Sequence, residues 1–159
     1  MTLDTVDLQL LAHLQRDASL SNLELAQRAN TSPPTCLRRV KRLRDAGLIE
    51  KQIAILQPER MAAVIGHGLT AIVEITLDRQ DSEALDRFEA NVQQEASVQQ
   101  CYRVSPGPDF VLVVHAVHMP HYQALTQRLF TANSNVRNVK AFFSVKRSKF
   151  GAELPLPTT

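Results

Sequence analysis

The chain of 159 residues is long enough for one domain or two small ones, and 44% hydrophobic residues allow a core of normal size. Its formal net charge of +2 is too small to imply a class of partner, so only the distribution of charge along the chain is informative. No apolar run approaches the roughly 18–20 residues that a membrane helix needs, so we expect no membrane-spanning helix.

The first part of the chain predicts two short helices. Asp4 suits the N-cap of the first helix and Asp7 the same helix N-terminus, and apolar residues then recur at helical spacing until Asp17. The pattern Ser21-Asn22-Leu23-Glu24 is a capping box, because its hydroxyl and carboxylate can satisfy each other's backbone donors. It predicts the start of the second helix.

A third helix is expected after the tight turn Asn30-Thr31-Ser32. Ser32 suits its N-cap and Pro33 its first position, where no amide donor is needed, and Gly47 follows its expected end near Ala46. Its inward-facing stripe is predicted to consist of Leu37, Val40 and Leu43.

The segment after this helix is rich in β-branched residues. We interpret residues 48–56 as a short strand or hairpin, which would form a β wing beside the three helices. Pro58 interrupts the pattern, and residues 57–68, which end in Gly66-His67-Gly68, are the expected linker, with room for one short helical turn.

The remainder of the chain alternates in the order β-α-β-β-α-β. The expected strands are 69–77, 98–105, 110–117 and 136–147, and the expected helices are 81–95 and 119–132. This order is typical of a ferredoxin-like domain, in which two helices cover one face of a four-stranded antiparallel sheet. The fold class is therefore α+β, with a winged helix-turn-helix at 1–56, a linker at 57–68 and a ferredoxin-like domain at 69–159. We expect a second subunit to cover the open face of the sheet.

The third helix concentrates positive charge. Between Arg38 and Arg44 it carries five basic residues and no acidic one. A basic helix that follows a tight turn is suited to neutralising phosphates and reading the major groove of double-stranded DNA, although a basic stripe also occurs on ordinary solvated helices. The capping box, the serine–proline start and the predicted wing together favour DNA binding. The predicted DNA contacts are Ser32, Pro33 and Thr35 near the base edges, Arg38 and Arg39 on guanines or phosphates, and Lys41, Arg42 and Lys51 on phosphates.

Three strings in this region carry a resemblance to a known family. They are Leu3-Asp4-x-x-Asp7-x-x-Leu10-Leu11-x-x-Leu14-Gln15-x-Asp17, Ser21-Asn22-x-Glu24-Leu25-Ala26, and Ser32-Pro33-x-x-Cys36-Leu37-Arg38-Arg39-Val40-x-x-Leu43-x-x-Ala46-Gly47-x-Ile49. With them the chain resembles the leucine-responsive/asparagine-regulator (Lrp/AsnC) family of transcription regulators. The resemblance extends through the β-α-β-β-α-β half to Lys149 and Leu154-Pro155-Leu156.

The resemblance implies a homodimer formed through the sheet domain, often assembled into an octamer. It also implies an amino acid or related metabolite as effector, bound between dimers near the turn that joins the second and third strands. The family pattern there resembles Val-Thr-Gly-x-x-Asp-Tyr, and this chain has Val104-Ser105-Pro106-Gly107-Pro108-Asp109-Phe110, with a proline where the glycine is expected. The predicted effector-binding residues are Ser105, Pro106, Gly107 and Asp109.

Two readings of this turn remain open. Asp109 could pair with the ammonium group of an effector while the Gly107 amide meets its carboxylate, or Asp109 could be an ordinary turn residue that satisfies its own backbone. Because two prolines remove amide donors from the turn, a ligand-independent architectural DNA-binding protein is the alternative function. A metabolic small-molecule-binding protein of ferredoxin-like fold is the second alternative.

Other chemistry finds little support in the sequence. His115, His118 and His121 are spaced by three, but they lie around a strand–helix junction that does not favour one metal geometry, so we expect no metal. Neither a phosphate-binding glycine loop nor a nucleophile motif stands out, so we expect no cofactor and no enzyme activity. Cys36 and Cys101 fit no CxxC spacing and the chain starts without a signal-peptide pattern, from which we expect reduced thiols and a cytoplasmic location.

Overall fold

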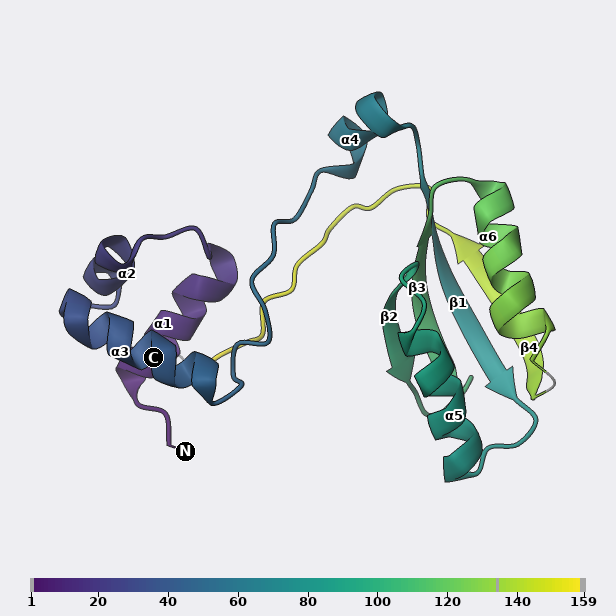
Figure 1. Ribbon diagram of the computed structural model, residues 1–159, viewed down its shortest axis with the longest axis horizontal. Helices are drawn as coiled ribbons and strands as arrows, with labels where there is room; N and C mark the ends of the chain where they lie inside the picture. The colour runs from purple at the N-terminus through teal and green to yellow at the C-terminus, as the bar shows by residue number, and fades with distance from the viewer. Residues whose placement is uncertain (1, 134, 158–159) are drawn as a thin grey trace. The chain divides into compact units, whose positions relative to one another are not determined.

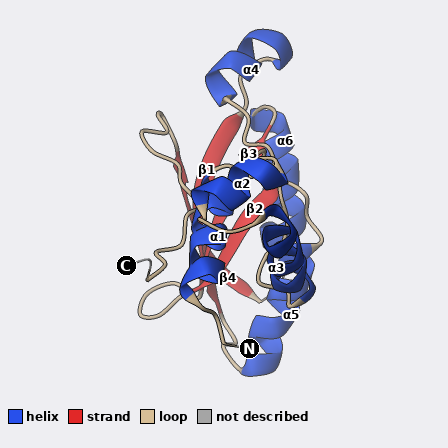
Figure 2. Ribbon diagram, turned by 90° about the vertical axis from the view of Figure 1, so that its left-hand side faces the viewer, coloured by secondary structure: helices blue, strands red, loops and turns tan. Residues whose placement is uncertain are grey.

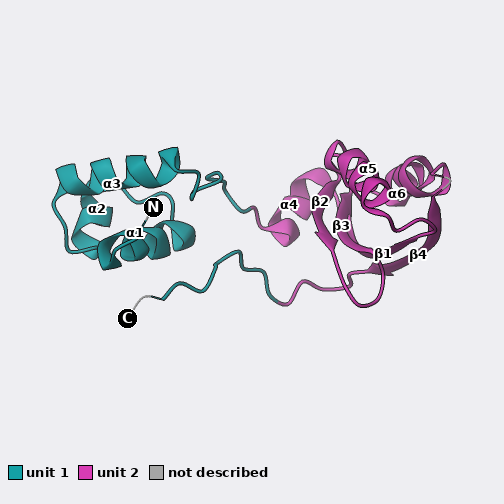
Figure 3. Ribbon diagram, turned by 90° about the horizontal axis from the view of Figure 1, so that it is seen from below, with its two compact units in different colours: residues 1–55, 149–159 teal, residues 56–148 magenta. Residues whose placement is uncertain are grey.

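The computed structural model describes residues 2–133 and 135–157, and the chain divides into two compact units (Figures 1 and 3). The helical unit comprises the chain up to Ile55 together with the last segment from Lys149, and the sheet unit comprises Leu56–Ser148. The elements in chain order are α1 Thr5–Arg16, α2 Asn22–Arg28, α3 Pro33–Asp45, α4 Pro58–Ile65, β1 Leu69–Leu77, α5 Ser82–Gln93, β2 Val98–Arg103, β3 Phe110–Ala116, α6 Met119–Thr126, the π-helical turn η1 Gln127–Thr131, and β4 Val136–Phe143. Among the described residues, no helix combines the length and apolar character needed to cross a membrane.

The three predicted helices of the helical unit are present, with the predicted caps. Asp4 and Asp7 form a capping box at α1, and Ser21 and Glu24 form another at α2. The backbone of Asn30 has φ 49°, in the left-handed region that asparagine tolerates, which lets the chain reverse between α2 and α3. These local signals place α3 directly after a tight turn.

The inward stripe of α3 differs from the expected one. Cys36 and Leu43 are fully buried and Val40 partly so, whereas Leu37 is 62% exposed, so the prediction that Leu37 faces the core is wrong. The spacing 36, 40, 43 satisfies helical periodicity as well as 37, 40, 43 does, and the small thiol of Cys36 fits against α1 and α2. The buried hydrophobic cluster of the unit consists of Leu10, Leu25, Ala26, Ala29, Cys36 and Leu43.

The predicted wing is also wrong. Residues 49–57 form neither helix nor strand, although Ile49 packs against the helical core. A strand is stable only beside a hydrogen-bonded neighbour, and the described part of the chain offers none to this segment. Its side chains Ile53 and Ile55 are therefore 67% and 58% exposed. The two-turn helix α4 lies within the region expected to be the linker.

The sheet unit has the predicted ferredoxin-like topology. Its four strands, red in Figure 2, are antiparallel in the order β2-β3-β1-β4, and α5 and α6 lie on the same side of the sheet (Figure 3). Three strands end earlier than expected, β2 at Arg103, β3 at Ala116 and β4 at Phe143, and the π-helical turn η1 follows α6 within the range expected for one helix. One face of the sheet is thus covered by helices of the same chain.

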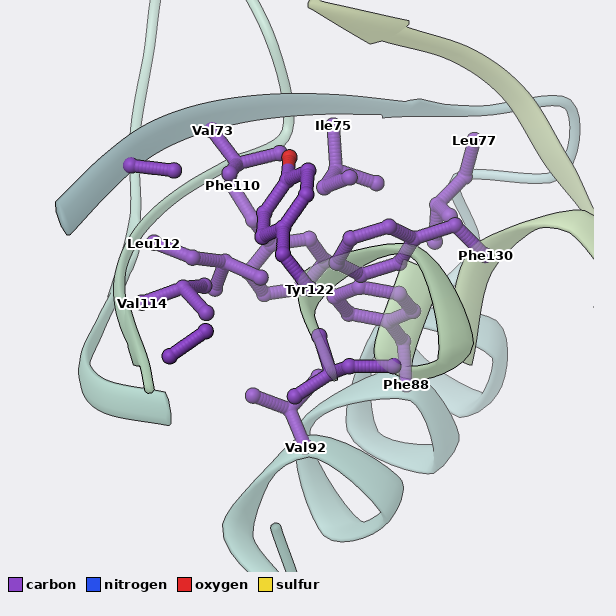
Figure 4. Packing of buried hydrophobic residues seen from close by; sticks show 13 residues of the cluster. Val73, Ile75, Leu77, Phe88, Val92, Phe110, Leu112, Val114, Tyr122 and Phe130 are labelled. Carbon is purple, nitrogen blue, oxygen red and sulfur yellow. The ribbon is translucent and has the colours of Figure 1, made fainter. Parts of the chain in front are cut away.

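The core of the sheet unit lies between the sheet and these helices. Thirteen buried residues form it, with β1 and β3 contributing alternate side chains (Figure 4). The rings of Phe88 on α5 and Phe110 on β3 pack with centroids 4.7 Å apart. This core holds the connections at the end of the sheet in place, including the turn between β2 and β3.

Candidate functional sites

The exposed face of α3 is the first candidate site. Pro34, Leu37, Arg38 and Lys41 are all exposed, and their spacing places them on one side of the helix, opposite Cys36 and Leu43. Arg38 forms no ion pair among the described residues, and Lys41 forms one with the exposed Asp45, with Nζ and Oδ2 2.6 Å apart. An exposed pair of this kind is weak and exchanges readily for a phosphate. The face therefore presents two available cations around one apolar side chain.

The other two predicted arginine contacts are turned toward α1 instead. The Arg39 guanidinium lies 2.7 Å from an oxygen of Asp4 and 2.8 Å from one of Asp7, and Arg42 Nη2 lies 2.5 Å from the second Asp7 oxygen. Asp7 is only 1% exposed, and the Arg39 side chain is 22% exposed. Arg39 is thus engaged in joining α1 to α3, whereas the half-exposed Arg42 retains a solvent-facing part.

The electrostatics of this cluster follow from its hydrogen bonds. The backbone N–H of Asp7 and then the Arg39 guanidinium lower the pKa of Asp4 below its usual 3.8. Hydrogen bonds to Asp4 and Asp7 raise the pKa of Arg39. The sequence contains a signal for this cluster, because acidic residues three apart at the start of α1 are matched by basic residues three apart on α3.

The start of α3 is held by its own polar side chains. The Ser32 hydroxyl accepts a hydrogen bond from the Thr35 amide and donates to Thr35 Oγ1 at 2.8 Å, and the Asn22 side chain donates to the Pro33 carbonyl at 2.9 Å. These contacts fix the entry of α3 relative to α2. Lys51 lies apart from them in the irregular segment, exposed and 3.7 Å from Glu50.

The turn between β2 and β3 is the second candidate site. Ser105, Pro106 and Gly107 are exposed, and Gly107 has φ 122°, a conformation that a side chain would strain. Asp109 is half-buried, and its Oδ2 accepts hydrogen bonds from the Leu77 amide at 2.7 Å and from Gln80 Nε2 at 3.2 Å. One oxygen of this carboxylate therefore fastens the turn to the end of β1.

A shallow cavity lies at the same end of the sheet unit. It has a volume of about 320 Å³, and the residues that line it are Asp78, Arg79, Ala84, Arg87, Phe88, Asn133 and Asn135. The Asn135 side chain accepts from the Arg79 amide at 2.8 Å and donates to its carbonyl, which joins two of the loops around the cavity. The cavity combines a carboxylate, guanidinium groups and amides. No residue of it was among the predicted effector-binding residues, because they gather only when β1, α5 and β4 are brought together.

Comparisons with known proteins bear on both sites. Residues 3–50 match the family model for a winged helix-turn-helix DNA-binding domain, and residues 70–154 match the model for the Lrp/AsnC ligand binding domain. The chain belongs to the Lrp/AsnC family. The resemblance noted in the sequence is thereby confirmed, as is the α+β fold with a helix-turn-helix and a four-stranded antiparallel sheet.

Relatives that match more than nine tenths of this Lrp/AsnC chain are named as regulators of transcription. A helix-turn-helix regulator of Haemophilus influenzae is 36% identical over 93% of this chain and 86% of its own. The leucine-responsive regulatory protein of Salmonella typhimurium is 32% identical over 98% and 93%. Among solved structures, a transcriptional regulator of Neisseria meningitidis in complex with L-methionine has a TM-score of 0.82, 29% identity, and 97% coverage of both chains.

Residues considered for other chemistry have structural roles in this Lrp/AsnC chain. His118 caps α6 by accepting from the His121 amide at 3.0 Å, while His115 shares a hydrogen bond with Thr70 at 2.9 Å. Burial raises the pKa of the Cys36 thiol, which lies in the core of the helical unit.

Proposed function

We propose that the exposed face of α3, centred on Arg38, is the DNA-reading surface of a transcription regulator. The observation that carries this proposal is the arrangement of α3: Arg39 holds one side of the helix against α1, so the opposite side, with Leu37, Arg38 and Lys41, projects outward. Arg38 and Lys41 would contact guanine or phosphates, and Leu37 would contact thymine methyl groups. Ser32, Pro33 and Thr35 would lie closest to the base edges, and Arg42 and Lys51 would touch phosphates.

The test measures binding of the full-length protein to the DNA upstream of its own gene by fluorescence anisotropy over a range of salt concentrations. We expect Arg38→Ala to lower affinity about tenfold and to reduce the salt slope by about one. Arg87→Ala is the matched control, because Arg87 is 69% exposed on α5 in the other unit. Equal affinities for the two variants would contradict the proposal.

The open face of the sheet supports a homodimer. The register places Ile72 of β1 beside Val113 of β3 and Phe142 of β4, which makes an apolar row across three strands. Ile72 and Phe142 are 43% and 46% exposed, and a second copy of the chain would cover them. Glu74 and Lys140 lie opposite each other in the same face and would orient the partner. Phe142→Asp should shift the protein to monomer in sedimentation, whereas a wild-type chain that is already monomeric would contradict the dimer.

Such a dimer would present two α3 helices to successive major grooves, so the operator should be roughly palindromic with half-sites about 10 bp apart. Assembly of dimers into an octamer, the state that the family resemblance implies, would wrap the DNA and favour flexible, A·T-rich spacers. The protein would act by binding and assembly rather than by catalysis, without a cofactor, and in the cytoplasm where its DNA target lies.

An amino acid or related metabolite is the proposed effector. The match to the Lrp/AsnC ligand binding domain supports it, and so does the polar end of the sheet unit, where the exposed Gly107 is two residues from Asp109. Ser105, Pro106 and Gly107 would contact the ligand between dimers, with the second oxygen of Asp109 facing its ammonium group. Binding of DNA and binding of effector would be coupled. The factor by which DNA changes the affinity for the effector should therefore equal the factor by which the effector changes the affinity for DNA.

The anisotropy experiment also decides between the effector-responsive regulator and the architectural alternative. Each common amino acid is added in turn, and one of them should shift DNA affinity and raise the melting temperature. Salt-sensitive binding that is indifferent to every amino acid would favour the architectural protein. If no DNA binding is found at low salt, the metabolic small-molecule-binding alternative is favoured.

A further inference from the structure

The last segment of the chain contacts α1 rather than the sheet from which it emerges. The Gln15 side chain accepts a hydrogen bond from the Leu154 amide at 2.9 Å and donates one to the Leu154 carbonyl at 2.9 Å. At the next residue of α1, Arg16 Nε lies 3.0 Å from Glu153 Oε2. The segment from Lys149 therefore groups with the helical unit, although the sequence assigned it to the second domain (Figure 3).

The chemistry of the segment suits this contact. In Leu154-Pro155-Leu156-Pro157 the two prolines fix φ and leave backbone donors only on the leucines, so the segment is extended before it binds and loses little entropy on docking. A glutamine that pairs with both the N–H and the C=O of one residue recognises extended backbone. The Arg16–Glu153 pair fixes the register of the segment, because Arg16 pairs with an acidic residue immediately before the leucine that Gln15 binds.

We propose that the C-terminal end of α1 is a peptide-binding surface whose ligand is the chain's own segment 149–157. The sheet unit is then connected to the DNA-binding unit twice, covalently through residues 49–57 and non-covalently through the docked segment that follows β4. The second connection restrains the orientation of α3, and its release loosens the pairing of two α3 helices on one operator. This consequence for DNA rests on the proposed function, whereas the docking itself does not.

Docking is tested without DNA by amide hydrogen exchange and mass spectrometry on the full-length protein. Because prolines carry no amide, a peptide covering residues 152–157 reports on few sites, of which Leu154 is the protected one. Gln15→Ala should speed exchange of this peptide about five- to tenfold, the factor expected for loss of a hydrogen bond. Gln27→Ala on α2, an exposed glutamine of the same unit, is the matched control and should leave it unchanged.

Charge reversal tests the register. Arg16→Glu and Glu153→Arg should each speed exchange of the 152–157 peptide, and the double variant, which restores an opposite-charge pair, should return it toward wild type. Additive effects of the two reversals would contradict the pair. Wild-type exchange of this peptide at the rate of an unstructured chain would overturn the proposal.

The second arm measures the consequence for DNA. Gln15→Ala should weaken binding to a fragment with two half-sites several-fold and leave binding to a single half-site unchanged, because only the paired geometry depends on the restraint. An equal loss of affinity for both fragments, or no loss for either, would overturn the proposal that the docked segment restrains α3. Failure of all variants to bind DNA would count against the proposed function and leave the hydrogen-exchange result standing.

Discussion

The helical unit and the sheet unit both bury apolar residues on one side of their elements. They differ in the number of buried apolar side chains and in whether a charged side chain is buried beside them. Among the described residues, the buried cluster of the sheet unit contains thirteen side chains, all of them hydrophobic or aromatic, whereas the buried cluster of the helical unit contains six, beside the buried carboxylate of Asp7. A three-helix unit of this size has limited apolar area to bury. Its ion cluster adds charged hydrogen bonds between α1 and α3 to this apolar packing.

Unfolding of the two units can be followed separately because they have different optical signals. The chain has no Trp, and its two tyrosines, Tyr102 and Tyr122, both lie in the sheet unit. Tyrosine fluorescence therefore reports unfolding of the sheet unit alone, while far-ultraviolet circular dichroism reports both units.

The largest effect should come from the core of the sheet unit. Phe110→Ala removes a fully buried ring and should lower the free energy of unfolding by roughly 3–5 kcal/mol, seen by tyrosine fluorescence in urea. Phe142→Ala is the control, since Phe142 lies on the open face and is 46% exposed. Its effect should depend on protein concentration, because it acts through the proposed dimer. A loss below about 1 kcal/mol for Phe110→Ala would contradict the assigned core.

A smaller effect is expected from the ion cluster of the helical unit. Asp7→Asn leaves two arginines without their shared carboxylate, and removal of one partner of a buried pair costs roughly 3–5 kcal/mol. Because the Arg42 side chain is 47% exposed, we expect about 2–3 kcal/mol, detected by circular dichroism with tyrosine fluorescence unchanged. Asp45→Asn removes an exposed partner of Lys41 and should change stability by less than about 0.5 kcal/mol. Similar values for the two variants would show that the cluster is not structural.

The exposed leucine of α3 separates stability from DNA recognition. Leu37→Ala should change the free energy of unfolding by less than about 0.5 kcal/mol, because the side chain is 62% exposed. It should lower affinity for a thymine-containing operator about three- to tenfold, as measured by anisotropy, through loss of contact with thymine methyl groups. A large loss of stability with unchanged DNA binding would instead indicate that Leu37 is part of the core.

The smallest effect should be the pH dependence of stability that arises from Asp4. Since hydrogen bonds from Asp7 and Arg39 lower the folded-state pKa of Asp4 below 3.8, its stabilisation is present above that value and is lost as pH falls through the lower folded pKa. Asp4→Asn keeps a capping side chain but not the charge, so it isolates this contribution. The melting temperature of the helical unit should be lower in the variant at pH 7, and the difference should shrink as pH falls below 3.8 and vanish below the folded-state pKa of Asp4. A difference that is constant with pH would exclude the charge as its cause.

Patterns among residues close together in the sequence were sufficient to predict most of the helices and strands. The caps at Asp4, Ser21 and Ser32 marked the helix starts because capping involves residues within three positions of one another. Alternation placed β1 at 69–77 because one of its faces is buried by helices of the same chain. The wing failed because strand formation in residues 48–56 depends on a neighbour that the sequence pattern does not reveal.

The sequence by itself determined the three helices, the ferredoxin-like order, the Lrp/AsnC family and a basic third helix as the candidate DNA contact. Only the tertiary structure decided which basic residues of that helix remain available: Arg39 is engaged by Asp4 and Asp7, while Arg38 projects beside an exposed Leu37. It also decided that the segment around Leu154 lies against Gln15 of α1, 139 positions away. Periodicity reports which residues share a face of one element, but the partner of that face depends on contacts between residues far apart in the chain, and those arise only on folding.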